Sequence, residues 1–298
     1  MNEQRYPLCQ GPDPNPLPVV FDLPGGAVDC HAHIFGPVER YPLSPARGYT
    51  PPEASLDSYL ALHKALGGVE RAVLTQPSVY GTDNDCMMDA VGAAGKNFRA
   101  IVAVGPDITD RELEDLHARG ARGVRVNLAD KGGNPFADVR SVQTFTERLK
   151  AIGWHLEVLI RVHEFDGLFD AMSKMAVPVS FGHLGYMRTD HGVAQAGFQD
   201  LLALLKEGRC WVKLTGTYRI ATTPGPPYAD IRPQAEALIR ANEDQLVWGT
   251  DWPHPTFSGL MPNDGPLFDQ LALWASDSAL RKKILVSNPE SLYGFDSL

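Results

Sequence analysis

Eight short apolar segments alternate with segments of helical periodicity along most of this chain, and this alternation constrains the fold more than any other feature. Several of the apolar segments are almost continuously apolar, as strands covered on both faces must be. The predicted strands are residues 27–35, 71–78, 98–106, 123–128, 155–162, 177–184, 210–217 and 246–251. Strands that alternate with helices favour a parallel sheet whose faces are covered by those helices.

The segments between the predicted strands carry the spacing and the end signals of helices. The clearest predicted helices are residues 55–66, 111–119, 139–152, 194–206 and 232–241. Asp110 precedes one of them as an N-terminal signal, and a glycine follows four of the apolar stripes as a C-terminal stop. These four glycines are Gly67, Gly120, Gly153 and Gly208. Eight such pairs predict an α/β fold, a closed (β/α)8 TIM barrel. An open doubly wound sheet is the alternative, but its usual G-x-G-x-x-G motif is absent.

The length of 298 residues would allow two domains, but an α/β barrel commonly fills about 250 residues alone. Residues 1–26 are polar and carry prolines at alternating positions, which favours an extended arm. We therefore expect an N-terminal arm over 1–26 and one barrel domain over 27–298. A second insertion, from Pro37 to Pro52, follows the first strand and would lie over the barrel mouth, as a lid or as a packed surface loop.

The charge balance excludes several classes of partner. The chain has 27 Lys and Arg against 36 Asp and Glu, a formal net charge of −9, which argues against nucleic acid and anionic membranes. No apolar run reaches the roughly 20 residues of a membrane span. Four widely spaced cysteines without a C-x-x-C pair favour free thiols in a reducing compartment. We expect a cytoplasmic protein that acts on a small molecule, either alone or as a homo-oligomer.

Polar residues gather at the ends of the predicted strands, where the active sites of barrels lie. Strand alternation places His31 and His33 of the first strand on one face. The sixth strand ends at His183 and the eighth at Asp251. The other polar residues near strand ends are Ser78, Arg125, Asn127, Arg161, Lys213 and Thr215. The topology therefore brings imidazoles, one carboxylate and several cations to one mouth.

Three imidazoles and one carboxylate suit hydrolysis in two ways. His31, His33, His183 and Asp251 could bind a divalent metal such as zinc or manganese that acidifies a water molecule. Alternatively, the imidazoles could polarise a carbonyl group while Asp251 takes a proton from the attacking water. The residues alone leave both mechanisms open.

Four strings of residues resemble a known family. They are Asp-Cys-His-Ala-His-Ile-Phe-Gly-Pro (29–37), Gly-Thr-Asp-Asn (81–84), Arg-Gly-Val-Arg-Val-Asn (122–127) and Gly-Thr-Asp-Trp-Pro-His-Pro (249–255). With His183, they resemble the amidohydrolase superfamily and, within it, the 2-pyrone-4,6-dicarboxylate lactonase-like family. The similarity extends from about Tyr6 to Tyr293.

The resemblance implies hydrolytic opening of a lactone, or its closure, in aromatic catabolism. It implies that His31, His33 and His183 polarise the lactone carbonyl and that Asp251 activates water, with no metal. Some relatives use a divalent metal, but the fourth strand lacks the Lys or Glu that bridges binuclear sites. We therefore expect no cofactor.

The resemblance also implies substrate contacts. Ser78, Arg125 and Arg219 match positions that hold substrate carboxylates, a role that suits the forked guanidinium group. Leu159 replaces a family tyrosine, and a second arginine after the fourth strand is missing, so Arg161 and Lys131 are candidate replacements. His254 is a further candidate, either for substrate contact or for fixing its loop.

The sequence therefore predicts a hydrolase of a small carboxylated lactone. One alternative is a metal-dependent amidohydrolase-type hydrolase or decarboxylase of an aromatic acid. The other is a non-catalytic barrel that binds small anions.

Overall fold

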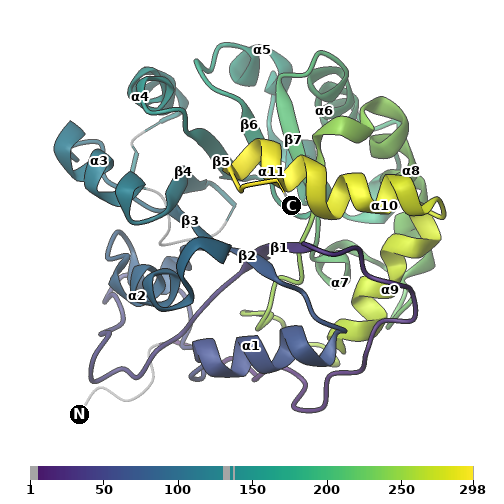
Figure 1. The fold of residues 1–298 in the computed structure, drawn as a ribbon. Helices are drawn as coiled ribbons and strands as arrows, with labels where there is room; N and C mark the ends of the chain where they lie inside the picture. Colours follow the sequence, from purple (N-terminus) through teal and green to yellow (C-terminus); the bar gives the residue numbers. More distant parts are fainter. Residues whose placement is uncertain (1–5, 130–134, 137, 298) are drawn as a thin grey trace.

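The computed structural model describes residues 6–129, 135–136 and 138–297, and it contains one eight-stranded sheet in which the strands pair in chain order. Every pairing between consecutive strands is parallel. The strands are β1 (Val28–Ala32), β2 (Arg71–Thr75), β3 (Phe98–Val102), β4 (Ala121–Asn127), β5 (His155–Leu159), β6 (Val179–Phe181), β7 (Cys210–Leu214) and β8 (Leu246–Trp248). Each lies within or beside a predicted segment, and Figure 1 shows them ringed by helices.

The first and last strands meet just beyond their ends and close the barrel. Ala32 forms an isolated parallel bridge with Trp252, and the backbone N–H of His33 donates to the Trp252 carbonyl at 2.8 Å. The N–H of Asp251 donates to the His31 carbonyl at 2.7 Å. The predicted (β/α)8 barrel is confirmed, and the closure places two histidines beside the aspartate.

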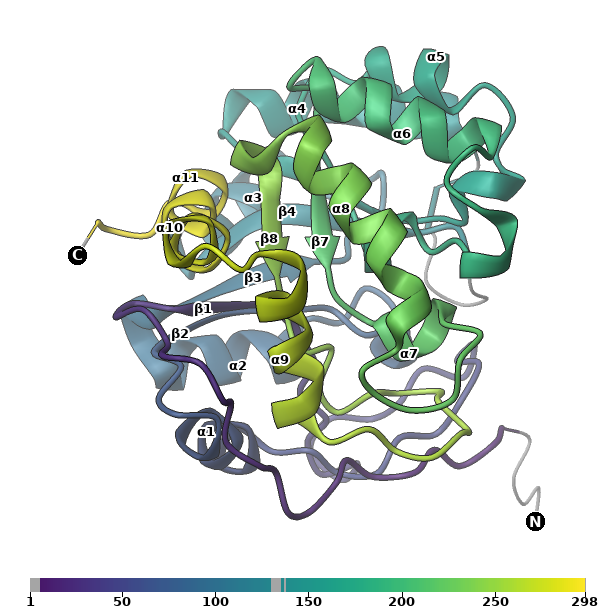
Figure 2. The same cartoon turned by 90° about the vertical axis from the view of Figure 1, so that its right-hand side faces the viewer.

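Helices follow the strands on the outside of the barrel (Figures 1 and 2). The helices of the described residues are α1 (Leu56–Ala65), α2 (Asp85–Ala94), α3 (Asp110–Ala118), α4 (Val139–Ala151), α5 (Leu168–Ser173), α6 (Ala196–Lys206), α7 (Thr217–Ile220), α8 (Arg232–Ala241), α9 (Asp264–Trp274), α10 (Ser278–Lys282) and α11 (Asn288–Tyr293). The five predicted helices correspond to α1, α3, α4, α6 and α8. None of these eleven helices is long and apolar enough to cross a membrane.

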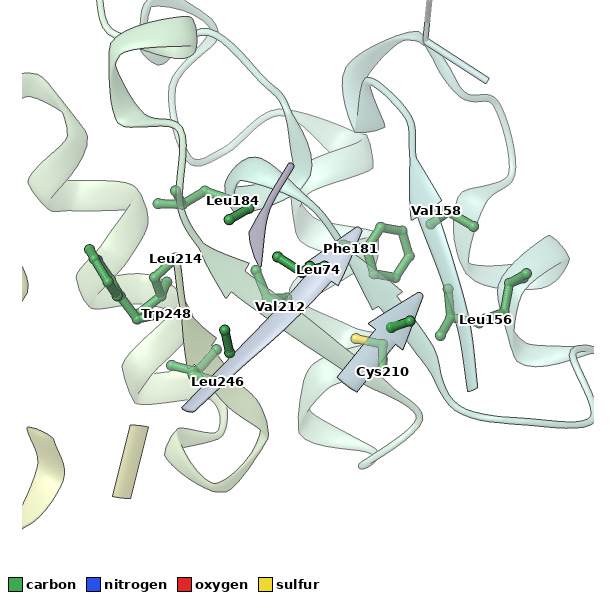
Figure 3. Packing of buried hydrophobic residues seen from close by; sticks show 14 of the residues in the cluster. Leu74, Leu156, Val158, Phe181, Leu184, Cys210, Val212, Leu214, Leu246 and Trp248 are labelled. Carbon is green, nitrogen blue, oxygen red and sulfur yellow. The ribbon is translucent and has the colours of Figure 1, made fainter. Parts of the chain in front are cut away.

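Two apolar clusters fill the space around and inside the strands. The larger one lies between the strands and the helices, and Figure 3 shows part of it, including Leu156, Phe181 and Trp248. The smaller one joins residues of β1, β2, β3, β7 and β8 to Tyr293 at the end of α11. Since both faces of the strands are covered, their sequences are nearly continuously apolar.

Most predicted strands extend too far at their carboxyl ends. β1 ends at Ala32 and β8 at Trp248, although the predicted strands continue to residues 35 and 251. The residues beyond these ends are still buried, and no break in the local sequence pattern marks the point where the strand pairing stops. They leave the sheet to form the walls of the mouth, which is where the functional side chains lie.

The helix end signals are mostly confirmed, with one correction. Asp110 is the first residue of α3, and the cap is Thr109, which forms a reciprocal capping box with Glu112. The box satisfies two free backbone donors at once, so it is preferred to a single aspartate cap. The four glycines that follow helices all have positive φ, from 70° to 109°, a region that glycine enters without steric cost.

The N-terminal segment from residue 6 lies against two other parts of the chain. The N–H of Cys9 donates to the Thr50 carbonyl at 2.9 Å, beside the mouth, and the N–H of Leu17 donates to Asn263 Oδ1 at 2.9 Å. The segment between Pro37 and Pro52 therefore lies between the arm and the barrel, and its Tyr49 is 8% exposed. Figure 2 shows the arm passing α9.

Candidate active site

A cavity of about 350 Å³ opens at the carboxyl ends of the strands. Its wall combines cationic, polar and apolar side chains from most strand ends. The lining residues are His33, Gly48, Tyr49, Ser78, Arg125, Asn127, Ala129, Leu159, His183, Tyr186, Arg219, Asp251, Pro255 and Thr256. This is the end of a barrel at which active sites lie.

The carboxylate of Asp251 is held through one oxygen and left open at the other. Oδ2 accepts hydrogen bonds from the Tyr218 hydroxyl at 2.5 Å and from Arg219 Nε at 2.6 Å. Among the described residues Oδ1 has no hydrogen-bond partner, and it lies 3.5 Å from His31 Nε2 and 3.7 Å from His33 Nε2. Oδ1 is therefore the oxygen that can accept a proton from water.

The surroundings of Asp251 keep it ionised. Burial alone would raise the pKa of this carboxyl, but the charge of the Arg219 guanidinium holds the pKa well below its usual value. Its backbone has a φ of 66°, a conformation that costs a non-glycine residue on the order of 1 kcal/mol or more. The contacts of Asp251 outweigh this cost and fix the direction of its side chain.

The ring of His33 lies on the cavity wall, and its Nδ1 faces the backbone at the end of β2. Nδ1 lies 2.7 Å from the carbonyl oxygen of Thr75. A carbonyl oxygen only accepts hydrogen bonds, so Nδ1 carries the proton and the neutral ring has a bare Nε2. Burial lowers the pKa of His33 from its usual value, with Asp251 opposing the shift, so the neutral form prevails. Nε2 therefore presents a lone pair beside Asp251.

His183 also lies on the wall, directly after β6. Its Nε2 is 4.0 Å from Asp251 Oδ2, and its Nδ1 has no hydrogen-bond partner in the part of the chain that the structure describes. The ring packs so closely on Gly216 that a Cβ there would overlap it. Burial lowers the pKa of His183 to about 4, against the opposing effect of Asp251. A neutral ring with its proton on Nε2 directs that N–H at Asp251 and the cavity.

His31 lies beneath the cavity and is absent from its wall. The pairing register between β1 and β2 shifts between Asp29 and Ala32, an irregularity of the kind that redirects side chains at barrel rims. His31 Nδ1 faces Lys213 Nζ at 3.2 Å and Glu157 Oε1 at 3.7 Å. Burial and the Lys213 charge lower the pKa of His31 well below its usual value, so this ring is neutral as well.

A buried chain of polar groups continues from Asp251 away from the cavity. The Tyr218 hydroxyl that donates to Asp251 lies 3.1 Å from His254 Nδ1, and His254 Nε2 lies 3.2 Å from Asp264 Oδ1. His254 is fully buried and does not line the cavity. The turn after Pro253 directs it between Tyr218 and Asp264, so it supports the carboxylate from behind.

Two arginines provide the positive charge of the wall. Arg125 donates from Nη1 to the Gln76 carbonyl at 2.9 Å, and its Nε has no hydrogen-bond partner within residues 6–129, 135–136 and 138–297. Arg219 also donates to the Pro255 carbonyl at 2.9 Å and to Thr256 at 3.3 Å. Arg125 therefore has uncommitted donors, whereas Arg219 is shared between Asp251 and the rim of the mouth.

The structure brings most of the residues predicted for the site together. His33, His183, Asp251, Ser78, Arg125 and Arg219 line the cavity, whereas His31, Arg161 and His254 do not. Arg161 instead donates to the Ala129 carbonyl at 2.9 Å and lies over the Tyr186 ring. Lys131 lies outside the described residues.

Two cavity-lining residues, Tyr186 and Thr256, and two buried residues beside the site, Tyr218 and Glu157, were not predicted from the sequence. Tyr218 belongs to the four-residue α7, which is too short to show periodicity, and no pattern indicated Glu157. Lys213 was predicted to line the barrel interior, and the structure places it there. It is fully buried and forms an ion pair with Glu157, and the placement of both on inward-facing strand positions is the one signal that the sequence carried.

His31, His183 and Asp251 are the residues that could share a metal ion. One ligand atom from each lies within 4.8 Å of the others, and no other such group occurs in the part of the chain that the structure describes. The fit of these atoms to a metal depends on which nitrogen of His31 carries the proton.

A protein-family model described as Amidohydrolase matches residues 28–295. The chain is 38% identical to a 4-sulfomuconolactone hydrolase of Rhizobium radiobacter, over 98% of both chains. It is 34% identical to a 2-pyrone-4,6-dicarboxylate hydrolase of Comamonas testosteroni, over 94% of this chain and 93% of that one.

Among solved structures, a probable 2-pyrone-4,6-dicarboxylic acid hydrolase from Acinetobacter baumannii, crystallised with citric acid bound, has a TM-score of 0.78. That protein is 27% identical, and the alignment covers 91% of this chain and all of the other.

Proposed function

This chain belongs to the amidohydrolase family, and we propose from this that it is a lactonase that opens a small lactone carrying acidic groups. The main support for this proposal is the way in which the two carboxylate oxygens of Asp251 are held. Its Oδ2 is held by Tyr218 and Arg219, while Oδ1, beside the cavity, has no hydrogen-bond partner among the residues that the structure describes. A non-catalytic anion-binding barrel would gain nothing from an ionised carboxylate in a pocket for anions.

The attacking water is placed by two acceptors. Asp251 Oδ1 and the bare Nε2 of His33 lie 3.7 Å apart, so one water molecule can donate a hydrogen bond to each. This arrangement directs a lone pair of the water oxygen away from both acceptors. Asp251 takes the proton as the water attacks, which is general base catalysis.

The lactone carbonyl is polarised from the opposite side of the water. Asp251 and His183 share the cavity wall with Arg125, which has uncommitted donors. A His183 Nε2–H and an Arg125 N–H can stabilise the negative charge that develops on the carbonyl oxygen. The C–O ring bond then breaks, and the leaving oxygen receives the proton that Asp251 took from water. The product is an open-chain acid that carries the water's O–H on its new carboxyl group and the water's other proton on the former ring oxygen.

We infer an anionic substrate, because the pocket is lined by cationic side chains although the protein as a whole is acidic. Arg125, Arg219 and Ser78 can bind a carboxylate or sulfonate, and Leu159 supplies an apolar wall for the ring. Two relatives are named for lactones that carry such groups, sulfomuconolactone and pyrone dicarboxylate. We propose the same class here, with side chains alone performing the chemistry and no cofactor.

A panel of lactones tests the proposed function. Ring opening releases a carboxylic acid, so a pH-stat follows it directly. We expect turnover of sulfonated, dicarboxylated or sugar-acid lactones and none of uncharged γ-butyrolactone. Evolution of CO2 from an aromatic acid would instead identify a decarboxylase. Thermal stabilisation by carboxylates without turnover of any lactone would identify a binding protein, and either result would overturn the proposal.

A further inference from the structure

We infer that Lys213 is a positioning residue that fixes the proton of His31 on Nε2, so that His31 donates toward the open oxygen of Asp251. The catalytic consequence rests on the proposed function, but the placement of the proton does not. Nothing in the family resemblance gives Lys213 a role, and it touches neither the cavity nor the catalytic carboxylate directly.

The three protons of Lys213 each need an acceptor. Its ammonium group has three N–H donors and no acceptor, and its side chain is fully buried. Three acceptors surround Nζ. They are the carbonyl oxygen of Cys30 at 2.8 Å, the carboxylate of Glu157 in an ion pair, and Nδ1 of His31 at 3.2 Å. A buried charge requires satisfied donors, so each acceptor takes one proton.

His31 must therefore accept at Nδ1. An Nδ1–H would face the N–H of Lys213 and would leave that donor unsatisfied. Thr75 Oγ1, at 3.4 Å from Nδ1, can donate as readily as it accepts. Glu157 Oε1 could accept from an Nδ1–H but cannot donate to a bare Nδ1, and it is 3.7 Å away with its carboxylate already paired with Lys213. The neutral ring consequently carries its proton on Nε2.

That proton points at Asp251. His31 Nε2 lies 3.5 Å from Oδ1 and has no hydrogen-bond partner among the described residues. His31 in β1 and His33 just after it thus play opposite hydrogen-bonding roles. His31 presents an N–H to Oδ1, and His33, whose proton goes to the Thr75 carbonyl, presents a lone pair. The geometry therefore gives one histidine the role of steadying Asp251 and the other the role of accepting from water.

The same placement of the proton makes His31 a poor metal ligand. A histidine that binds a metal through Nε2 normally donates its other N–H to a carboxylate or a carbonyl oxygen. The neighbour of Nδ1 is instead the Lys213 ammonium, and Nε2 has no lone pair to offer. The His31, His183 and Asp251 group has metal-like spacing, but the donors present do not fit a metal.

Histidine NMR tests the proton directly on the free protein. A long-range 1H–15N spectrum of the 15N-histidine-labelled chain distinguishes a protonated Nδ1 from a protonated Nε2, and the resonance of His31 is identified by its loss in His31→Asn. We expect His31 in the Nε2–H form and His33 in the Nδ1–H form. Detection of His31 as Nδ1–H would overturn the inference, whether or not the protein opens lactones.

Two variants separate the role of Lys213 from a general effect on packing. Lys213→Met with Glu157→Gln removes the buried pair without leaving a lone charge, and Glu157→Gln alone keeps the lysine donor. We expect the double variant to lose the pure Nε2–H form of His31 and at least tenfold in kcat, with KM changed less than threefold. We expect Glu157→Gln to keep the wild-type form. Equal His31 spectra in the wild type and a folded double variant would contradict the role of Lys213.

Discussion

Arg219→Met should raise the pH at which the enzyme loses activity in acid. Arg219 Nε lies 2.6 Å from Asp251 Oδ2, and both groups are nearly inaccessible to water. Two unit charges about 4 Å apart attract each other by about 4 kcal/mol at an effective dielectric constant near 20. This energy corresponds to about 3 pKa units, and a single partner typically shifts a carboxyl by about 1–3 units.

The direction of the shift in the pH profile follows from the role of Asp251 as a base. The carboxylate must be ionised to accept a proton, so kcat/KM falls as the pH drops through its pKa. Arg219 holds this pKa well below its usual value, which places the acid limb of the wild type below about pH 4. Without Arg219, burial dominates and raises the pKa. We expect the acid limb of kcat/KM to move up by about 1–3 pH units.

The assay is the pH dependence of kcat/KM on one lactone, recorded for the wild type and the variant after brief exposure to each pH. Ionisation of the substrate is common to both proteins and cancels. Arg161→Met is the matched control, because it removes the same charge from the protein near the mouth but Arg161 contacts Ala129 and Tyr186 instead of Asp251. Superimposable acid limbs for Arg219→Met and the wild type, or an equal shift in Arg161→Met, would show that the Arg219 contact does not set the pKa of Asp251.

Three further predictions concern the rest of the site. Arg125→Met should raise KM by about 10- to 100-fold, the worth of a charge-assisted hydrogen bond of about 1.5–3 kcal/mol, and an unchanged KM would remove Arg125 from the substrate contacts. Gly216→Ala should lower kcat and destabilise the fold by about 1–3 kcal/mol, measured by kinetics and denaturant unfolding, because φ is 65° there and a Cβ would overlap the His183 ring. Chelator treatment should leave activity unchanged with less than stoichiometric zinc or manganese by elemental analysis, whereas loss of activity restored by metal would contradict the mechanism.

The barrel could be predicted from the sequence because the burial pattern that produces it repeats along the chain. Each strand is covered on both faces and each helix on one, and these two patterns alternate eight times. Strand ends could not be predicted to the residue, because the chain beyond them stays buried around the cavity. His33, His183 and Asp251 were found because a parallel barrel brings all carboxyl ends to one mouth.

The directions of the side chains required the structure. His254 stands in the most specific string of the sequence, but its φ of 62° turns it away from the cavity. His31 and His33 share a predicted face, yet Lys213 and the Thr75 carbonyl give them opposite hydrogen-bonding roles. These contacts join segments up to 182 residues apart, and no local pattern carries such information.

Asp251→Asn tests whether Asp251 is the base that activates the water. An amide cannot take the proton from water, and it changes neither the size of the side chain nor its place beside Tyr218. On the lactone that the wild type opens fastest, we predict a fall in kcat of about 10²–10⁴-fold, with a folded protein that still binds the substrate. Turnover within threefold of the wild type would contradict the account.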